Sequence, residues 1–166
     1  MTGAPTPAPA AFPPAPVLHV VLVEPEIPPN TGNVARLCAA TRCRLHLVEP
    51  LGFRVEDRYL RRAGLDYWEH VDVRTWKSLD ALLETEPAGR FFLYSSRVHR
   101  PYTRAAHSPG DWLLFGCETR GLPEPLLARF ADRTYTIPMW GPVRSLNLST
   151  SVGIVVYEAL RQIHGF

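Results

Sequence analysis

The order of apolar and polar residues along the chain predicts strands that alternate with helices. Short apolar runs typical of buried strands lie at 18–23, 45–48, 90–94, 112–116 and 134–138. Between and after them, apolar residues recur at helical spacing beyond Gly32, over 55–63 and 77–85, over 123–130, and from residue 148 onward. The segment 24–32, rich in proline, is predicted to be a rigid loop. Such alternation predicts an α/β domain with a mainly parallel sheet flanked by helices.

The last of these helices follows a polar loop. Asn147 or Ser149 can cap its N-terminus, and the first free N–H groups of the helix then face whatever lies in the loop. The loop follows a buried run, and polar loops in that place are where α/β proteins bind ligands. A capped C-terminal helix without a ligand is the plainer alternative.

The first 16 residues differ from the rest because proline and alanine dominate them. Proline at this density removes backbone donors and favours extended, solvated chain. The sequence therefore predicts a disordered tail at 1–16 and one domain at 17–166.

Composition excludes several classes of protein. The net charge of +2 among 166 residues is too small to indicate which class of partner the protein binds. Three cysteines without a C-x-x-C pair fit a reducing cytoplasm rather than a disulfide scaffold or a zinc site. No apolar run approaches the length of a membrane span. The six histidines lack metal-ligand spacing, so no metal is expected, and His19 and His46, inside predicted strands, are expected to be structural.

Candidate chemistry gathers where predicted strands end. Common nucleotide-binding and nucleophile motifs are missing, but polar residues follow several strands, namely Asn30, Arg36, Gly116, Glu118, Ser145 and Asn147. Singly, each has a structural explanation, such as capping a turn or accepting backbone N–H groups. In a parallel sheet these loops converge on one edge, which predicts a shared ligand site.

At four places the chain resembles the SPOUT RNA methyltransferases. The segment 25–33 with 36–38 is similar to their first motif, 115–123 to the second, and 137–139 with 144–149 to the third, while 60–67 is typical of one branch. The resemblance runs in order from residue 18 to 164 and is closest to the tRNA (cytidine/uridine-34) 2′-O-methyltransferase branch.

This resemblance implies a fold, a cofactor and partners. The fold is α/β with a C-terminal deep trefoil knot, and the active sites lie at the subunit interface of a homodimer. The methyl donor is S-adenosylmethionine, and the substrate is the anticodon stem-loop of tRNA. Matching positions imply that the cofactor is held by Tyr94, Gly116, Ile137 and Ser145, and that catalysis uses Arg36, Asn30, Glu118, Ser145 and Asn147. Helix N–H groups near Ser149 are expected to help hold a ligand carboxylate.

Two groups of basic residues are candidate RNA contacts. The first comprises Arg54, Arg58, Arg61 and Arg62, and the second comprises Arg97, His99, Arg100 and Arg104. A solvated surface paired with Glu56 and Asp57 is the alternative for the first.

Three rival functions remain open at this stage. One is a hydrolase using Cys117, which requires a nearby histidine. Another is an RNA-binding protein that has kept the fold without the chemistry. The third is a SPOUT enzyme acting on another tRNA or rRNA 2′-hydroxyl.

Overall fold

A computed structural model describes residues 15–55 and 68–166. Residues 1–14 of the predicted tail at 1–16, most of the predicted helix over 55–63 and the segment 60–67 lie outside the described residues. Three residues of the first basic group lie there too, namely Arg58, Arg61 and Arg62.

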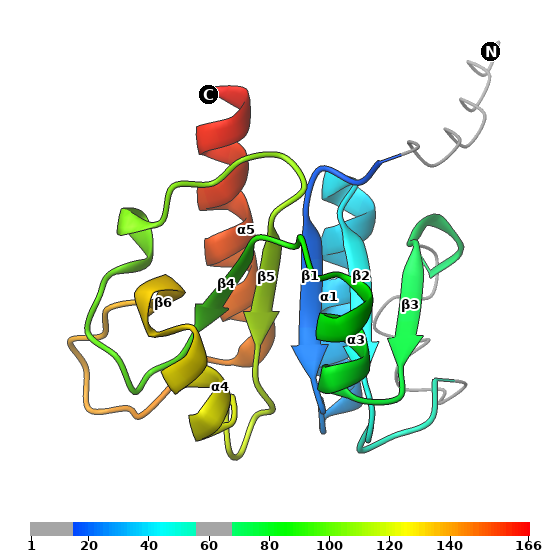
Figure 1. Ribbon diagram of the computed structural model, residues 1–166, viewed down its shortest axis with the longest axis horizontal. Coiled ribbons are helices and arrows are strands. Elements are labelled where there is room, and N and C mark those ends of the chain that lie inside the picture. The colour runs from blue at the N-terminus through cyan, green and yellow to red at the C-terminus, as the bar shows by residue number, and fades with distance from the viewer. Residues whose placement is uncertain (1–14, 56–67) are drawn as a thin grey trace, which may run out of the picture.

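The centre of the fold is a six-stranded parallel sheet with the order β3-β2-β1-β5-β4-β6 (Figure 1). The strands are β1 (His19–Val23), β2 (Arg44–Val48), β3 (Val73–Trp76), β4 (Phe91–Tyr94), β5 (Trp112–Phe115) and β6 (Thr134–Tyr135). Each predicted strand is present, although β6 ends three residues before the predicted boundary at Pro138. The edge strand β3 was not predicted, because its exposed Arg74 and Thr75 break the apolar pattern of a buried strand.

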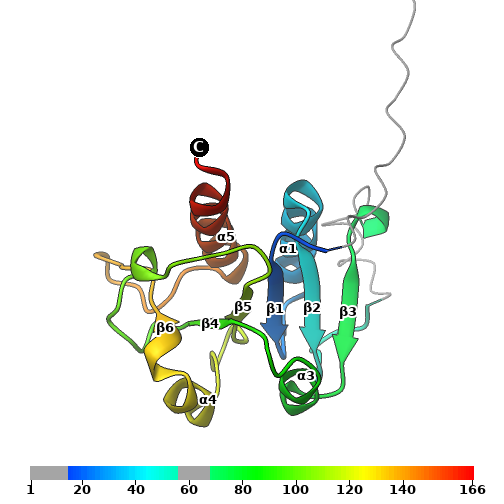
Figure 2. The same cartoon turned by 45° about the horizontal axis from the view of Figure 1, so that its top comes forward.

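Helices cover both faces of the sheet (Figure 2). α1 (Pro28–Thr41) and α5 (Leu148–His164) pack on one face, while α3 (Leu79–Thr85) and α4 (Glu124–Arg129) pack on the other. Successive strand residues point to opposite faces, so Val20 and Leu22 join the α1/α5 core while Val21 and Val23 join the α3/α4 core. The 3-10 turns are η1 (Trp68–His70), η2 (Tyr102–Arg104) and η3 (Ala131–Arg133). No helix among the described residues is long and apolar enough to cross a membrane.

α1 begins earlier than the pattern predicts. The segment 24–32 was expected to be a loop, but the helix starts at Pro28, with prolines in its first turn. Proline suits this position because the first helical N–H groups have no intrahelical acceptor. Asn30 and Thr31 are consequently buried in the first turn of a helix.

The loop over 95–110 is hydrogen-bonded to the chain on both sides of the C-terminal segment that joins β6 to α5. Thr136 N–H donates to the Arg100 carbonyl and Tyr102 N–H to the Thr136 carbonyl, both at 2.8 Å. Further along the same loop, the Gln162 side chain in α5 donates to the Ala105 carbonyl at 3.0 Å and accepts the His107 N–H at 2.8 Å. The loop over 95–110 thus binds the chain both before and after the segment between β6 and α5, and this clasp is a feature expected of a C-terminal knot.

A buried hydrogen-bond network closes the base of that loop. The Tyr94 hydroxyl lies 2.9 Å from His107 Nε2, and His107 Nδ1 lies 3.3 Å from the Asp111 carboxylate. Arg90 Nε donates to the same carboxylate at 2.8 Å. Burial by itself would raise the pKa of Asp111, but hydrogen bonds from His107, the Ser108 N–H and Arg90 lower it below its ordinary value. Burial raises the pKa of Tyr94, so its hydroxyl stays protonated and donates to His107.

The two strand histidines form a second network, on the α3/α4 face. Trp76 Nε1 donates to His46 Nδ1 at 2.9 Å, which leaves the proton of a neutral His46 on Nε2, 2.9 Å from His19 Nδ1. The His19 ring stacks on Trp112 with centroids 3.9 Å apart. Both histidines therefore pack and bond within the fold, as expected of structural residues.

This network makes the fold sensitive to acid. Burial, reinforced by nearby cationic groups, lowers the pKa of His46 from 6.5 to about 2 and that of His19 to about 4. Below pH 6.5 both histidines become protonated in the unfolded chain but stay neutral in the folded chain. The free energy of unfolding therefore falls as pH falls toward 4. His46 contributes up to about 1.4 kcal/mol per pH unit.

Urea denaturation at pH 7, 6 and 5 measures this loss. His46→Gln, which keeps an acceptor for Trp76, is expected to flatten the slope, whereas His99→Gln on an exposed loop leaves it unchanged. An equal slope in wild type and His46→Gln contradicts the assignment.

Candidate active site

The candidate site lies at the carboxyl ends of the strands, where β1 and β5 are neighbours. From β1 the chain continues to β2 and β3 on one side, while β5, β4 and β6 lie on the other side. This reversal opens a crevice above the sheet, the usual ligand position in open α/β sheets. The pocket there has a volume of about 580 Å³, within the range of small-molecule sites.

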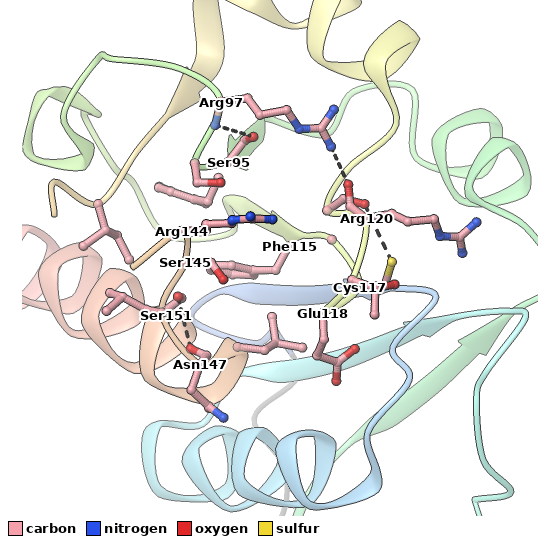
Figure 3. Close-up of a pocket in the computed structure, with 18 of the residues that line it drawn as sticks. Ser95, Arg97, Phe115, Cys117, Glu118, Arg120, Arg144, Ser145, Asn147 and Ser151 are labelled. Carbon is pink, nitrogen blue, oxygen red and sulfur yellow. Dashed lines mark hydrogen bonds between the residues drawn. The ribbon is translucent and has the colours of Figure 1, made fainter. Parts of the chain in front are cut away.

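Most of the predicted site residues line this pocket. They are Asn30, Tyr94, Gly116, Glu118, Ile137, Ser145 and Asn147. They come from α1, from the ends of β4 and β5, and from the loop that leads into α5 (Figure 3). Arg36 is the exception and does not line the pocket.

Glu118 joins the loop after β5 to the start of α1. Its carboxylate accepts hydrogen bonds from the backbone N–H groups of Glu26 at 2.8 Å and Ile27 at 3.0 Å. It also accepts from Asn30 Nδ2 at 3.2 Å. A carboxylate with these donors is fixed in place and adds negative charge at the N-terminus of α1, where the helix dipole favours it.

Asn30 and Asn147 continue this chain of hydrogen bonds across the pocket. Asn147 Nδ2 donates to Asn30 Oδ1 at 2.9 Å, and in Figure 3 the Glu118 and Asn147 side chains both point toward α1. Asn147 Oδ1 caps α5 by accepting from the Ser149 N–H at 2.9 Å and the Thr150 N–H at 3.4 Å. The expectation that N–H groups near Ser149 are available for a ligand carboxylate is therefore wrong, because the cap takes them.

A second carboxylate strengthens the same junction from the opposite side. Glu26 accepts from the Thr119 hydroxyl at 2.8 Å and from its N–H at 3.2 Å. Arg120 donates to Glu24 at 3.1 Å. The loops that follow β1 and β5 are therefore tied together in both directions, which presets the pocket wall.

Gly116 allows the pocket wall to fold back on itself. A Cβ atom at Gly116 would lie 2.0 Å from the Gly121 carbonyl carbon and 2.2 Å from the Leu122 nitrogen. Gly121 has φ +67°, a left-handed conformation that glycine adopts without strain. Its N–H donates to the Cys117 carbonyl at 3.0 Å, closing a tight turn.

The arginines at the pocket differ in how they are held. Arg97 binds Glu124 and the carbonyls of Arg120 and Leu122, so this member of the second basic group stabilises the pocket wall. Arg100 binds the Asp132 carbonyl. Arg144 is exposed, and in Figure 3 it lies between Ser95 and Phe115.

Arg36 lies on the exposed face of α1. It follows Asn30 by six residues, roughly 9 Å along the helix axis at 1.5 Å per residue. The structure thus brings Asn30 into the pocket and leaves Arg36 outside, at a distance that an extended ligand on α1 can span.

Several residues that line the pocket were not assigned to a ligand site from the sequence. They are Ser95, Ser96 and Arg97 after β4, and Thr136, Met139 and Arg144 after β6. The signal was available for the first three, because they follow the carboxyl end of a predicted strand, the same rule that selected Glu118.

The structure gives no support to the hydrolase alternative. The Cys117 thiol is buried and lies 3.9 Å from the Gly121 carbonyl oxygen, and no histidine within the described ranges is hydrogen-bonded to it. The same ranges contain no group of three His, Cys, Asp or Glu side chains that could hold a metal ion.

A parallel sheet clasped at its C-terminal end, with its pocket made by the loops around that clasp, matches the fold expected of the SPOUT RNA methyltransferases. The chain belongs to the SpoU rRNA Methylase family, whose model matches residues 17–157. It is 52% identical over 150 residues to the tRNA (cytidine(34)-2′-O)-methyltransferase of Burkholderia pseudomallei, covering 88% of this chain and 96% of that protein.

Solved structures show the same fold. One, from work on 2′-OH methylation of C/U34 on tRNA, matches with a TM-score of 0.86 and 55% identity over 90% of this chain and 97% of that one. Another, an AdoMet-bound rRNA methyltransferase from Sinorhizobium meliloti, matches with a TM-score of 0.79 and 24% identity over 94% of this chain and 60% of that one. These likenesses confirm the predicted α/β fold with its C-terminal trefoil knot.

Proposed function

We propose that the protein is a tRNA (cytidine/uridine-34) 2′-O-methyltransferase that uses S-adenosylmethionine. The proposal rests on one observation: the chain is about half identical, over nearly its full length, to a tRNA (cytidine(34)-2′-O)-methyltransferase, and the residues at the matching positions form a pocket. As its substrate is found in the cytoplasm and its cysteines are free, the cytoplasm is the proposed location.

The pocket suits the proposed methyl donor. Its volume of about 580 Å³ accepts a nucleoside-sized ligand, and Gly116 lets the returning loop pack closely against the end of β5 to form one wall. Tyr94, Ile137 and Ser145 complete the residues proposed to hold it. When bound, S-adenosylmethionine supplies an electrophilic methyl group.

The chain's own task is to present a ribose hydroxyl. A 2′-hydroxyl is almost fully protonated at neutral pH, so it must be oriented and relieved of its proton during attack. Holding reactants in an attack geometry contributes on the order of 7–11 kcal/mol in good intramolecular cases. We assign orientation to Ser145 and to the hydrogen-bonded Asn30 and Asn147, with Glu118 positioning Asn30.

We assign Arg36 to stabilising the negative charge that develops on the attacking 2′-oxygen. A guanidinium with a pKa above about 12 is a poor general base at neutral pH but a strong bidentate partner for phosphate and alkoxide. Bound RNA lying across α1 brings its backbone phosphate to Arg36, and that phosphate shares the hydroxyl proton in a hydrogen bond until the proton leaves to solvent.

The active form is proposed to be a homodimer with its sites at the subunit interface. The α1/α5 layer supports this, since Ile27 at the start of α1 is 44% exposed and Tyr157 in α5 is 50% exposed. Light scattering is expected to give twice the 18.6 kDa of one chain. Tyr157→Glu is expected to lower that mass, and an unchanged dimer removes this face from the interface.

The function is tested by transfer of labelled methyl from S-adenosylmethionine to unmodified tRNA transcripts, followed by nuclease mapping. Label is expected on the 2′-oxygen of nucleotide 34. Label at another tRNA position or on rRNA keeps the family and replaces the substrate. Cofactor binding without label on any RNA contradicts the proposal and favours a non-catalytic RNA-binding protein.

A further inference from the structure

Trp140 is exposed beside the pocket. It lies on the loop between β6 and α5, and 93% of its surface is accessible. The residue before it, Met139, and the nearby Arg144 both line the pocket. Large aromatic side chains are seldom left in water, so an exposed indole next to a ligand pocket marks a contact surface.

The other tryptophans of the chain have places in the fold. Trp112 is buried and stacks on His19, Trp76 donates to His46, and Trp68 packs against the core. Trp140 therefore differs from them in being exposed, and a Cβ at the adjacent Gly141 would meet nothing within 4 Å, so the chain beside the indole is open as well.

Arg144 supplies the charge that selects a partner for this indole. Arg97 and Arg120 on the same pocket are paired with Glu124 and Glu24. For Arg144, by contrast, no ion pair is present within 15–55 and 68–166, the ranges that the structure describes. A guanidinium without a carboxylate, four residues along the same loop from an exposed aromatic ring, is complementary to a polyanion that carries π-faces, which is single-stranded RNA.

We propose that Trp140 stacks on a nucleobase adjacent to the nucleotide that is methylated, while Arg144 contacts a neighbouring phosphate. The inference rests on the proposed function for its choice of RNA. A ribose that enters the pocket pulls its nucleotide out of the stack and exposes a face of the next base. Trp140 covers that face, and this stabilises the unstacked arrangement.

Binding of a fluorescent anticodon stem-loop, followed by anisotropy, tests the proposal without requiring methyl transfer. Trp140→Ala is expected to raise Kd by about tenfold or more, and Trp140→Phe by less than about threefold, because stacking is kept. Val143→Ala is the matched control, since Val143 is an exposed apolar residue of the same loop and is expected to leave Kd unchanged. Arg144→Ala is expected to reduce the salt dependence of binding by about one phosphate contact.

Stem-loops with an abasic site on either side of nucleotide 34 locate the base. At one of the two flanking positions, the abasic site is expected to raise the Kd of the wild type. With that stem-loop, wild type and Trp140→Ala are expected to have the same Kd, because the stacked base is missing for both. An equal difference at both positions, or a Kd for Trp140→Ala within about twofold of wild type, overturns the inference.

Two outcomes distinguish the stacking role of Trp140 from the proposed function and from a role in the dimer. Wild-type RNA binding that depends on Trp140, without methyl transfer, contradicts the proposed function and leaves the stacking role intact. Loss of the dimer in Trp140→Ala, measured by light scattering, assigns Trp140 to a subunit contact and overturns the stacking role.

Discussion

Arg36→Ala is expected to lower kcat for methyl transfer to tRNA by about 10²- to 10³-fold, the usual cost of removing one group that stabilises developing charge. Arg36 does not line the pocket, so the affinity for S-adenosylmethionine is expected to stay within about twofold of wild type. Arg36→Lys is expected to fail nearly as badly, because an ammonium group cannot bind phosphate and alkoxide in the bidentate geometry of a guanidinium.

Single-turnover methyl transfer and calorimetric titration with S-adenosylmethionine measure the two effects separately. Arg129→Ala is the matched control, since it removes an exposed arginine from α4, on the opposite face of the sheet, and should retain full activity. Wild-type turnover in Arg36→Ala excludes Arg36 from catalysis, and weakened cofactor binding in that variant shows that α1 shapes the pocket.

Gly116→Ala is expected to abolish measurable binding of S-adenosylmethionine. The added Cβ would lie 2.0 Å and 2.2 Å from backbone atoms of the returning loop, and backbone cannot rotate away as a flexible side chain can. The turn over 116–121 must open, which displaces Glu118 from the N–H groups of Glu26 and Ile27. Overpacking of this kind also costs about 1–3 kcal/mol of folding stability.

Gly153→Ala provides the control for this substitution. Gly153 lies in α5, and its Cβ would meet nothing within 4 Å, so alanine is expected to stabilise the helix by about 0.5–1 kcal/mol and leave cofactor binding unchanged. Calorimetric titration and thermal unfolding of both variants are the measurements. Wild-type affinity in Gly116→Ala removes the turn from the proposed cofactor site.

Much of the site was predictable because it depends on local chain order. Residues directly after buried strands must emerge at one edge of a parallel sheet, and this rule placed Asn30, Glu118, Ser145 and Asn147 together. The partners of these residues were not predictable. Glu118 and Asn30 are separated by 88 positions in the chain, and Asn30 and Asn147 by 117, so only the assembled fold brings their side chains into contact.

The structure also changed how several residues are understood. Arg97 was a candidate RNA contact, but the return of the loop after β5 places carbonyl groups and Glu124 around its guanidinium. The first turn of α1 was expected to be loop, since two prolines and a glycine resemble a break in the chain. Proline is compatible with the start of a helix, and packing against the sheet decided in favour of the helix.

The sequence by itself determined the alternation of strands and helices, the buried faces of α1 and α5, and which loops carry polar groups, because these follow from local periodicity. Tertiary structure alone decided the clasp of the loop over 95–110 around the C-terminal segment, the separation of Arg36 from the pocket, and the exposure of Trp140. Each of these depends on which distant segments meet in space, and no local pattern of apolar and polar residues encodes that meeting.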